Sequence, residues 1–169
     1  MSKRDFLVNV SAIRGYPGSR IEVDTSGRID ELKVSGSSVP EDAKVRFHGV
    51  IEAMEAGQGV VASGEVSSIW TGLCRRCLGF ATGEISEHVR EIYEHDAVEG
   101  ETYALSGDLV DLEPLLRETV MLELPEAPLC SAECAGLCPT CGINRNEGTC
   151  DCVQEVGDPR WAALDALRD

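Results

Sequence analysis

The chain has 169 residues, of which 43% are hydrophobic and only 5% aromatic. This suits one globular domain with an appendage and a mainly aliphatic core, and it excludes an intrinsically disordered chain. Thirty acidic residues against 15 Lys and Arg give a formal net charge of −15, which argues against a broadly basic nucleic-acid-binding surface.

Residues 1–20 lack the apolar run of a signal peptide, and no stretch of the chain approaches the roughly 20 apolar residues of a membrane span. We therefore expect a cytoplasmic protein with no membrane partner. In that reducing compartment, clustered cysteines are more often metal ligands or redox groups than structural disulfides.

The first half of the chain is rich in β-prone segments separated by turn residues. Val45, Phe47 and Ile51 alternate with polar residues and fall on one face of a half-buried strand. The predicted strands are residues 6–10, 21–23, 45–54, 59–73 and 80–96. Because the last three follow one another through tight turns, we predict an antiparallel β-meander, or small barrel-like sheet, with the CRRC sequence at the turn between the last two.

After a predicted connector at residues 99–108, the apolar period changes from two to three or four. Asp111 is the predicted N-cap of a helix at about residues 111–124, and Pro125 marks its end. This helix has one apolar stripe, which we expect to pack on the meander.

A second helix is predicted at the C-terminal end of the chain, with Asp158 as N-cap and Pro159 in the first turn. Since so short a helix is marginal alone in water, Trp161 and its neighbours are expected either to dock on their own domain or to enter a partner's groove. The predicted fold class is α+β: residues 1–127 form a β-rich domain with one packed helix, and residues 128–169 form a ribbon-like zinc-knuckle segment with the terminal helix.

The chain contains eight cysteines, six of them within residues 130–152. Cys138 and Cys141 form a C-P-T-C-G sequence, in which a glycine after the second thiol permits the tight turn of a zinc knuckle. Cys150 and Cys152 add two sulfurs after a short loop rich in turn formers. These four cysteines are therefore predicted to form one tetrahedral zinc site, site 1.

The remaining cysteines form two pairs that lie far apart in the sequence, Cys74 with Cys77 and Cys130 with Cys134. The simplest partition makes them a second zinc site, site 2, which clips the segment after the long helix to the turn of the meander. Two zinc ions per chain are then expected, although other partitions, with one zinc ion or with Cys130 or Cys134 in site 1, stay open. Iron–sulfur ligation also stays open, as does a redox role for the CRRC pair, since flanking arginines would favour its thiolate.

The sequence shows no G-x-S-x-G, P-loop or H-E-x-x-H motif, and none of its three histidines has metal or nucleophile spacing. Zinc held by four thiolates leaves no open position for a catalytic water. We therefore do not expect an enzyme.

Four segments, in their order along the chain, together resemble the bacterial YceD family, the large ribosomal RNA subunit accumulation proteins, in its cysteine-rich form. The resemblance covers roughly residues 40–169. The segments are CRRCL, DLEPLLRETVMLELP with its exit into PLC, AECAGLCPTCGINRNEGTCDC, and DPRWAALDALRD. The resemblance implies a non-catalytic accessory factor for accumulation or maturation of large-subunit (23S-type) ribosomal RNA, with that RNA or a pre-ribosomal particle as partner.

Direct contact with RNA requires a local basic patch. Among the few basic candidates, which also include Lys3, Arg4, Lys44, Arg46 and Arg145, Arg75 and Arg76 are preferred, because a metal-pinned turn would hold both guanidiniums rigidly for phosphate. A role that only offsets thiolate charge stays open for these two arginines. The alternative is an adaptor that binds a basic ribosomal protein or an assembly enzyme without touching RNA. Residues 84–126 hold 13 acidic residues against two arginines. A solvated acidic face is the simpler interpretation of this stretch, and a docking surface for a basic protein is the alternative.

Overall fold

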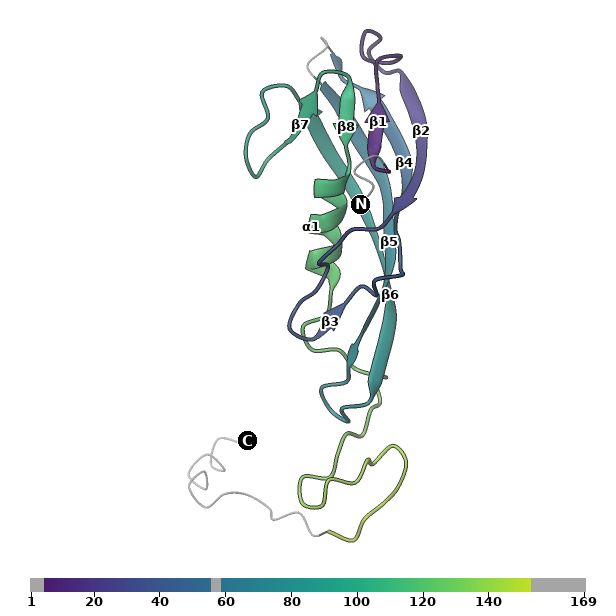
Figure 1. The fold of residues 1–169 in the computed structure, drawn as a ribbon, viewed down its shortest axis with the longest axis vertical. Helices are drawn as coiled ribbons and strands as arrows, with labels where there is room; N and C mark the ends of the chain where they lie inside the picture. The colour runs from purple at the N-terminus through teal and green to yellow at the C-terminus, as the bar shows by residue number, and fades with distance from the viewer. Residues whose placement is uncertain (1–4, 56–58, 153–169) are drawn as a thin grey trace, which may run out of the picture.

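The computed structural model describes residues 5–55 and 59–152 and is mostly β-structure (Figure 1). Three consecutive strands, β4 (Val45–Ala53), β5 (Gly59–Leu73) and β6 (Phe80–Glu94), pair antiparallel. The predicted meander is confirmed, and the CRRC turn joins β5 to β6. β2 (Arg20–Gly27) extends the sheet by pairing antiparallel with β4.

On the other side of β6 the sheet continues with two strands that the sequence did not predict. β7 (Tyr103–Ser106) pairs parallel with β6, and β8 (Leu109–Asp111) pairs antiparallel with β7. β8 also pairs antiparallel with β1 (Leu7–Asn9), which lies within the predicted strand at residues 6–10. The prediction of a plain connector at residues 99–108 is therefore wrong. β7 and β8 have four and three residues, too few for alternation to show in the sequence.

The strand order is β1-β8-β7-β6-β5-β4-β2, with β3 (Ser37–Ser38) paired to the free edge of β5 beyond β4. The two end strands lie side by side (Figure 1), and the Thr25 hydroxyl donates to the carbonyl oxygen of Asp5 at 2.5 Å. The sheet is therefore nearly closed, as the predicted barrel-like form requires.

The helix α1 (Glu113–Glu123) confirms the predicted helix at residues 111–124. Its N-cap position is Leu112, not Asp111 as predicted, but the Asp111 carboxylate accepts a hydrogen bond from the Glu113 N–H at 3.0 Å. Asp111 thus satisfies one of the unpaired N–H groups that begin every helix. The buried stripe of Leu115, Leu116 and Val120 packs α1 against β5 and β6, as expected.

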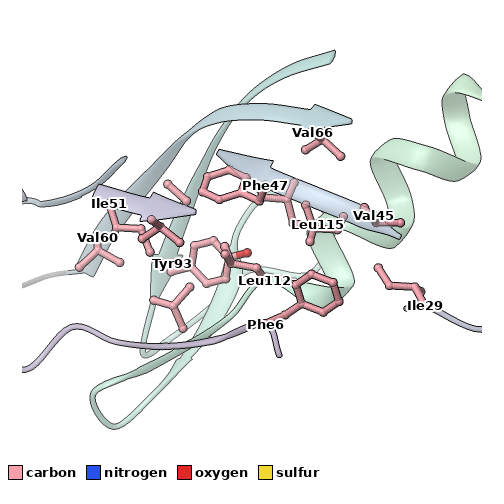
Figure 2. Close-up of a cluster of buried hydrophobic side chains, with 14 of the residues drawn as sticks. Phe6, Ile29, Val45, Phe47, Ile51, Val60, Val66, Tyr93, Leu112 and Leu115 are labelled. Carbon is pink, nitrogen blue, oxygen red and sulfur yellow. The ribbon is translucent and has the colours of Figure 1, made fainter. Parts of the chain in front are cut away.

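The core lies between α1 and the curled sheet (Figure 2). Val45, Phe47 and Ile51 are at most 1% exposed, which confirms the face predicted from their alternation. The Tyr93 ring reaches the same cluster from β6 and stacks on Tyr103, with 5.2 Å between the ring centroids. Each such buried side chain contributes about 2 kcal/mol to folding. This cluster therefore stabilises the sheet and α1 without help from the cysteines, which lie at the other end of the molecule (Figure 1).

Replacing Tyr93 with phenylalanine is expected to raise the free energy of unfolding by about 1 kcal/mol. The Tyr93 hydroxyl is buried, and it has no hydrogen-bond partner among the described residues. Burial also raises the pKa of this hydroxyl far above its usual range. Removing an unpaired buried hydroxyl relieves its desolvation cost, and urea denaturation measures the gain. A loss of stability would show that the hydroxyl has a partner.

Within the described ranges, no helix is long and apolar enough to cross a membrane. The predicted terminal helix at Asp158 lies outside these ranges. The division of the chain at residues 127 and 128 stays a prediction.

Candidate metal centres

The CRRC turn is shaped by backbone hydrogen bonds that aim two sulfurs in one direction. The Cys74 N–H donates to the carbonyl oxygen of Gly79 at 2.8 Å, and the Leu78 N–H donates to that of Cys74 at 2.9 Å. The Arg76 N–H points at the Cys74 Sγ, 3.4 Å away. N–H groups directed at a sulfur favour its thiolate form, which is the form that binds metal.

The C-P-T-C-G turn repeats this pattern. The Cys138 N–H donates to the carbonyl oxygen of Ile143 and the Gly142 N–H donates to that of Cys138, both at 2.9 Å. Gly142 has φ 76°, and Leu78, which stands at the corresponding place of the first turn, has φ 58°. The chain therefore builds the same turn twice, once with the glycine that a left-handed residue favours and once with a leucine.

The first turn and the segment after α1 bring four thiols together. The Sγ atoms of Cys74, Cys77, Cys130 and Cys134 all lie within 4.8 Å of one another. The Cys74 Sγ lies 3.7 Å from that of Cys134, and the Cys77 Sγ lies 3.6 Å from that of Cys130. A disulfide bond is about 2.0 Å long, whereas four sulfurs at about 2.3 Å from one zinc ion stand about 3.8 Å apart. The spacing suits a shared metal ion and not a disulfide.

The other four thiols form a second group, in which the Sγ atoms of Cys138, Cys141, Cys150 and Cys152 also lie within 4.8 Å of one another. This group is more exposed: only Cys138 is buried, whereas three of the four thiols of the first group are. The first group holds the residues predicted for site 2, and the second holds those predicted for site 1. In the structure Cys130 and Cys134 lie with the CRRC turn and not with site 1.

Each group favours the thiolate form at some cysteines and opposes it at others: in site 2 the pKa is lowered at Cys74 and Cys134 and raised at Cys77 and Cys130. Burial raises the pKa of the Cys74 thiol, but the backbone N–H groups of Cys130, Cys77 and Arg76 outweigh it and bring this pKa to about 6. The neighbouring thiols of Cys134 and Cys77 raise the pKa of Cys130 to about 12. Several thiolates cannot share so small a volume unless a cation balances their charge.

Site 1 has the same asymmetry. The backbone N–H groups of Cys141 and Thr140 lower the pKa of Cys138 to about 6, and the Cys141 thiol raises that of Cys152 to about 12. The residues of both groups therefore fit a bound divalent cation.

Asn146, which the sequence analysis missed, joins the two sites. It lies in the loop between Cys141 and Cys150, yet its Nδ2 donates to the Sγ of Cys134 in site 2 at 3.3 Å. Its Oδ1 accepts from the Ala135 N–H at 2.8 Å. A metal-bound thiolate is held in place by such outer hydrogen bonds, so Asn146 positions a site 2 sulfur from the loop of site 1.

The two candidate RNA-contacting arginines have different surroundings. The Arg76 Nη1 donates to the carbonyl oxygens of Ala132 and Cys134 at 3.3 and 3.1 Å. Arg76 therefore ties the hairpin turn to the Cys130–Cys134 segment. The Arg75 side chain is exposed and lines a surface groove.

Replacing Arg76 with alanine is expected to destabilise site 2 by about 1 kcal/mol and to release its metal several times faster, because two hydrogen bonds across the clip are lost. Arg75→Ala is the matched control, since it removes an equal charge from the next residue and no bond across the clip. Metal release to a chromogenic chelator measures both variants. Equal release rates would contradict a bracing role for Arg76.

Over residues 5–55 and 59–152 the structure thus defines a class of protein: a nearly closed β-sheet packed on α1, with one four-cysteine group that links the β5–β6 turn to the segment after α1 and a second one within residues 138–152. The chain belongs to the family described as "Large ribosomal RNA subunit accumulation protein YceD", whose model matches residues 62–168. The resemblance stated from the cysteine motifs is confirmed.

Similar curated proteins come from mycobacteria. An uncharacterized protein of Mycobacterium tuberculosis and one of Mycobacterium bovis are each 27% identical over 165 residues, covering 93% of this chain and 78% of the relative. An uncharacterized protein of Mycobacterium leprae is 29% identical over 151 residues, covering 79% of this chain and 62% of the relative. No solved structure matches the chain.

Proposed function

We propose that this protein is a non-catalytic cytoplasmic accessory factor for the accumulation or maturation of large-subunit ribosomal RNA, stabilised by two structural zinc ions. One observation carries the proposal. In a chain of the YceD family, site 2 takes two thiols from the β5–β6 turn and two from the segment after α1. A centre that links distant segments through four thiolates fixes shape and leaves no open position for a substrate.

Zinc is the metal that the residues favour. All eight donors are sulfur, which suits zinc or an iron–sulfur cluster and disfavours magnesium, calcium and manganese. The sulfur spacings of 3.6 and 3.7 Å in site 2 fit one tetrahedral ion. When bound, zinc supplies charge balance and crosslinking. Elemental analysis of the purified chain should find two zinc ions and no iron.

An adaptor without RNA contact is the second candidate, and the acidic stretch at residues 84–126 favours it. This stretch contains 13 acidic residues and only two arginines. One of these, Arg117, is already paired with Glu113 at 3.0 Å. Such a surface attracts a basic ribosomal protein, which would bring the factor to the pre-ribosomal particle.

The cellular test uses a strain that lacks the chain. We expect the ratio of large-subunit to small-subunit ribosomal RNA to fall, and the intact chain to restore it. Cys74→Ser should fail to restore the ratio, whereas Tyr93→Phe, which leaves both sites intact, should succeed. An unchanged ratio in the deletion strain would refute the proposed function for either candidate.

A further inference from the structure

Three large apolar side chains are exposed together at the end of the β5–β6 hairpin. Leu73, Leu78 and Phe80 are 63%, 63% and 68% exposed. Leu73 and Phe80 are cross-strand partners, and Leu78 lies in the CRRCL turn between them. We call these three residues the tip surface. Apolar groups clustered at an exposed turn are typical of a binding surface.

Leu78 is the least expected member of the tip surface. It has φ 58°, at the place where the other knuckle has Gly142 with φ 76°. A left-handed backbone costs a branched side chain about 1 kcal/mol. With 63% of the residue exposed, little packing within the chain offsets this cost. The Leu78 side chain is thus better explained by contact with a partner than by the fold.

A groove runs beside the tip surface, between β5 and the segment that holds β3, with Leu73 and Phe80 in its wall. Its polar lining includes two cations, four hydroxyl groups and one carboxylate, and of the hydroxyl groups that of Ser37 already donates to the Pro125 carbonyl oxygen. These residues are Lys33, Ser35, Ser37, Ser38, Thr71, Arg75 and Glu126. Among the described residues, neither cation has a side-chain partner. The groove is therefore locally cationic, although the whole chain carries −15.

We propose that the groove and the tip surface bind a single-stranded segment of RNA. A base stacks on the exposed Phe80 ring, and the backbone phosphates meet Arg75 and Lys33. Single-stranded nucleic acid combines flat apolar faces with regularly spaced negative charge, and its sites pair aromatic side chains with a cationic groove. The inference rests on the proposed function, because it names the RNA contact of that factor.

The surroundings favour RNA over a protein partner. The exposed leucines alone suit either, but an acidic chain with cations, hydroxyl groups and an aromatic ring in one groove matches phosphate, ribose and base together. Site 2 lies directly behind this surface, since Cys74 and Cys77 are buried in the same turn. A metal-clipped turn holds Phe80 and Arg75 in fixed positions, which lowers the entropy cost of binding.

The test measures binding of a fluorescent single-stranded RNA of about 12 nucleotides to the full zinc-loaded chain by anisotropy. Phe80→Ala is expected to weaken binding roughly tenfold to hundredfold through lost stacking. Tyr16→Ala is the matched control, because Tyr16 is also 68% exposed but lies in the loop before β2. It should leave the affinity unchanged. Both side chains are exposed, so both variants should fold, and an unchanged zinc content checks this.

Salt dependence tests the phosphate contact separately. Arg75→Ala is expected to reduce the slope of log affinity against log salt by about 0.7, the value for one lost phosphate contact on a single strand. Arg20→Ala, which removes an exposed arginine at the start of β2, should leave the slope unchanged. Equal effects of the two arginines would mean diffuse attraction and would overturn the site.

The inference and the proposed function can fail independently. Native affinity in Phe80→Ala, or no RNA binding by the intact chain, overturns the inference even where the deletion strain loses large-subunit RNA. The inference is also overturned if the chain binds a purified ribosomal protein but no RNA, and if Phe80→Ala abolishes that protein binding. The surface would then be a protein-docking site. If the deletion strain keeps a normal RNA ratio while Phe80→Ala still weakens binding, the inference stands and the proposed function fails.

Discussion

Replacing Cys74 with serine is expected to lower the zinc content from two ions per chain to one and to free residues 130–152 from the hairpin turn. Cys74 is fully buried, and its Sγ lies 3.7 Å from that of Cys134 in the other half of site 2. Since metal binding joins segments distant in sequence, loss of one ligand removes folding energy from the clip itself. The hydrogen bonds that remain across the clip include those from the Arg75 N–H to the Pro128 carbonyl oxygen and from the Leu137 N–H to that of Arg76.

The barrel should survive this change. The buried apolar side chains of its core form a different cluster from the one around Cys74, Cys77, Ala81 and Cys134, and the partly buried Trp70 packs against both. We therefore expect far-ultraviolet circular dichroism and the unfolding midpoint of the barrel to change little, while limited proteolysis cuts the chain rapidly after α1. Elemental analysis gives the zinc content of the same sample.

Cys150→Ser is the matched control for Cys74→Ser. It should also lose one zinc ion, but from site 1, and it should leave the junction between α1 and Cys134 resistant to protease. Global unfolding of the two variants to the same degree would contradict the partition into two separate sites. Retention of both zinc ions by Cys74→Ser would contradict the assignment of Cys74 as a ligand.

The long strands and the helix could be predicted because their periodicity extends over many residues. β4 to β6 have nine to 15 residues each, and α1 ends before a proline. β7 and β8 could not be predicted from the sequence, because only Leu105 and Val110 of these strands are buried. Two buried residues make no pattern in a sequence. The parallel pairing of β7 with β6 depends on the fold and not on local preference.

The surroundings of the cysteines were less predictable than their grouping. Spacing within a turn is local, so two C-x-x-C pairs signal two knuckles. Arg75 and Arg76 are adjacent in a tight turn, where no period tells which side chain faces inward. Only the structure shows that Arg76 binds the carbonyl oxygens across the clip while Arg75 lines the groove.

Asn146 illustrates a contact made when a loop folds back on an earlier segment. It stands 12 residues after the cysteine whose sulfur it contacts, in a stretch that the sequence suggests only as a turn. An amide side chain between ligand pairs is the one signal that could have suggested it, since its NH₂ group can donate a hydrogen bond to a ligating sulfur.

Replacing Asn146 with aspartate is expected to speed zinc release from site 2 roughly 10- to 100-fold, the usual effect of losing an outer-shell partner. The substitution keeps the oxygen that accepts from the Ala135 N–H. It exchanges the amide donor 3.3 Å from the Cys134 Sγ for a negatively charged oxygen. Repulsion between that oxygen and the thiolate then replaces a hydrogen bond. The bond from the Asn146 Nδ2 to the Asn144 Oδ1 at 2.9 Å is lost as well, while the bond from Ala135 is kept.

Asn144→Asp is the matched control, because it introduces the same charge two residues away. The Asn144 Nδ2 donates to Glu147 and to no sulfur, and its Oδ1, which accepts from Asn146, is kept.

A chromogenic chelator should show two phases of zinc release in the intact chain, and Cys74→Ser identifies the site 2 phase by its absence. Asn146→Asp should accelerate that phase, and Asn144→Asp should not. Because Asn146 is carried by the site 1 loop, removing site 1 with Cys150→Ser should also accelerate it. If Asn146→Asp accelerates only the site 1 phase, Asn146 does not hold the Cys134 sulfur, and the two sites are held independently.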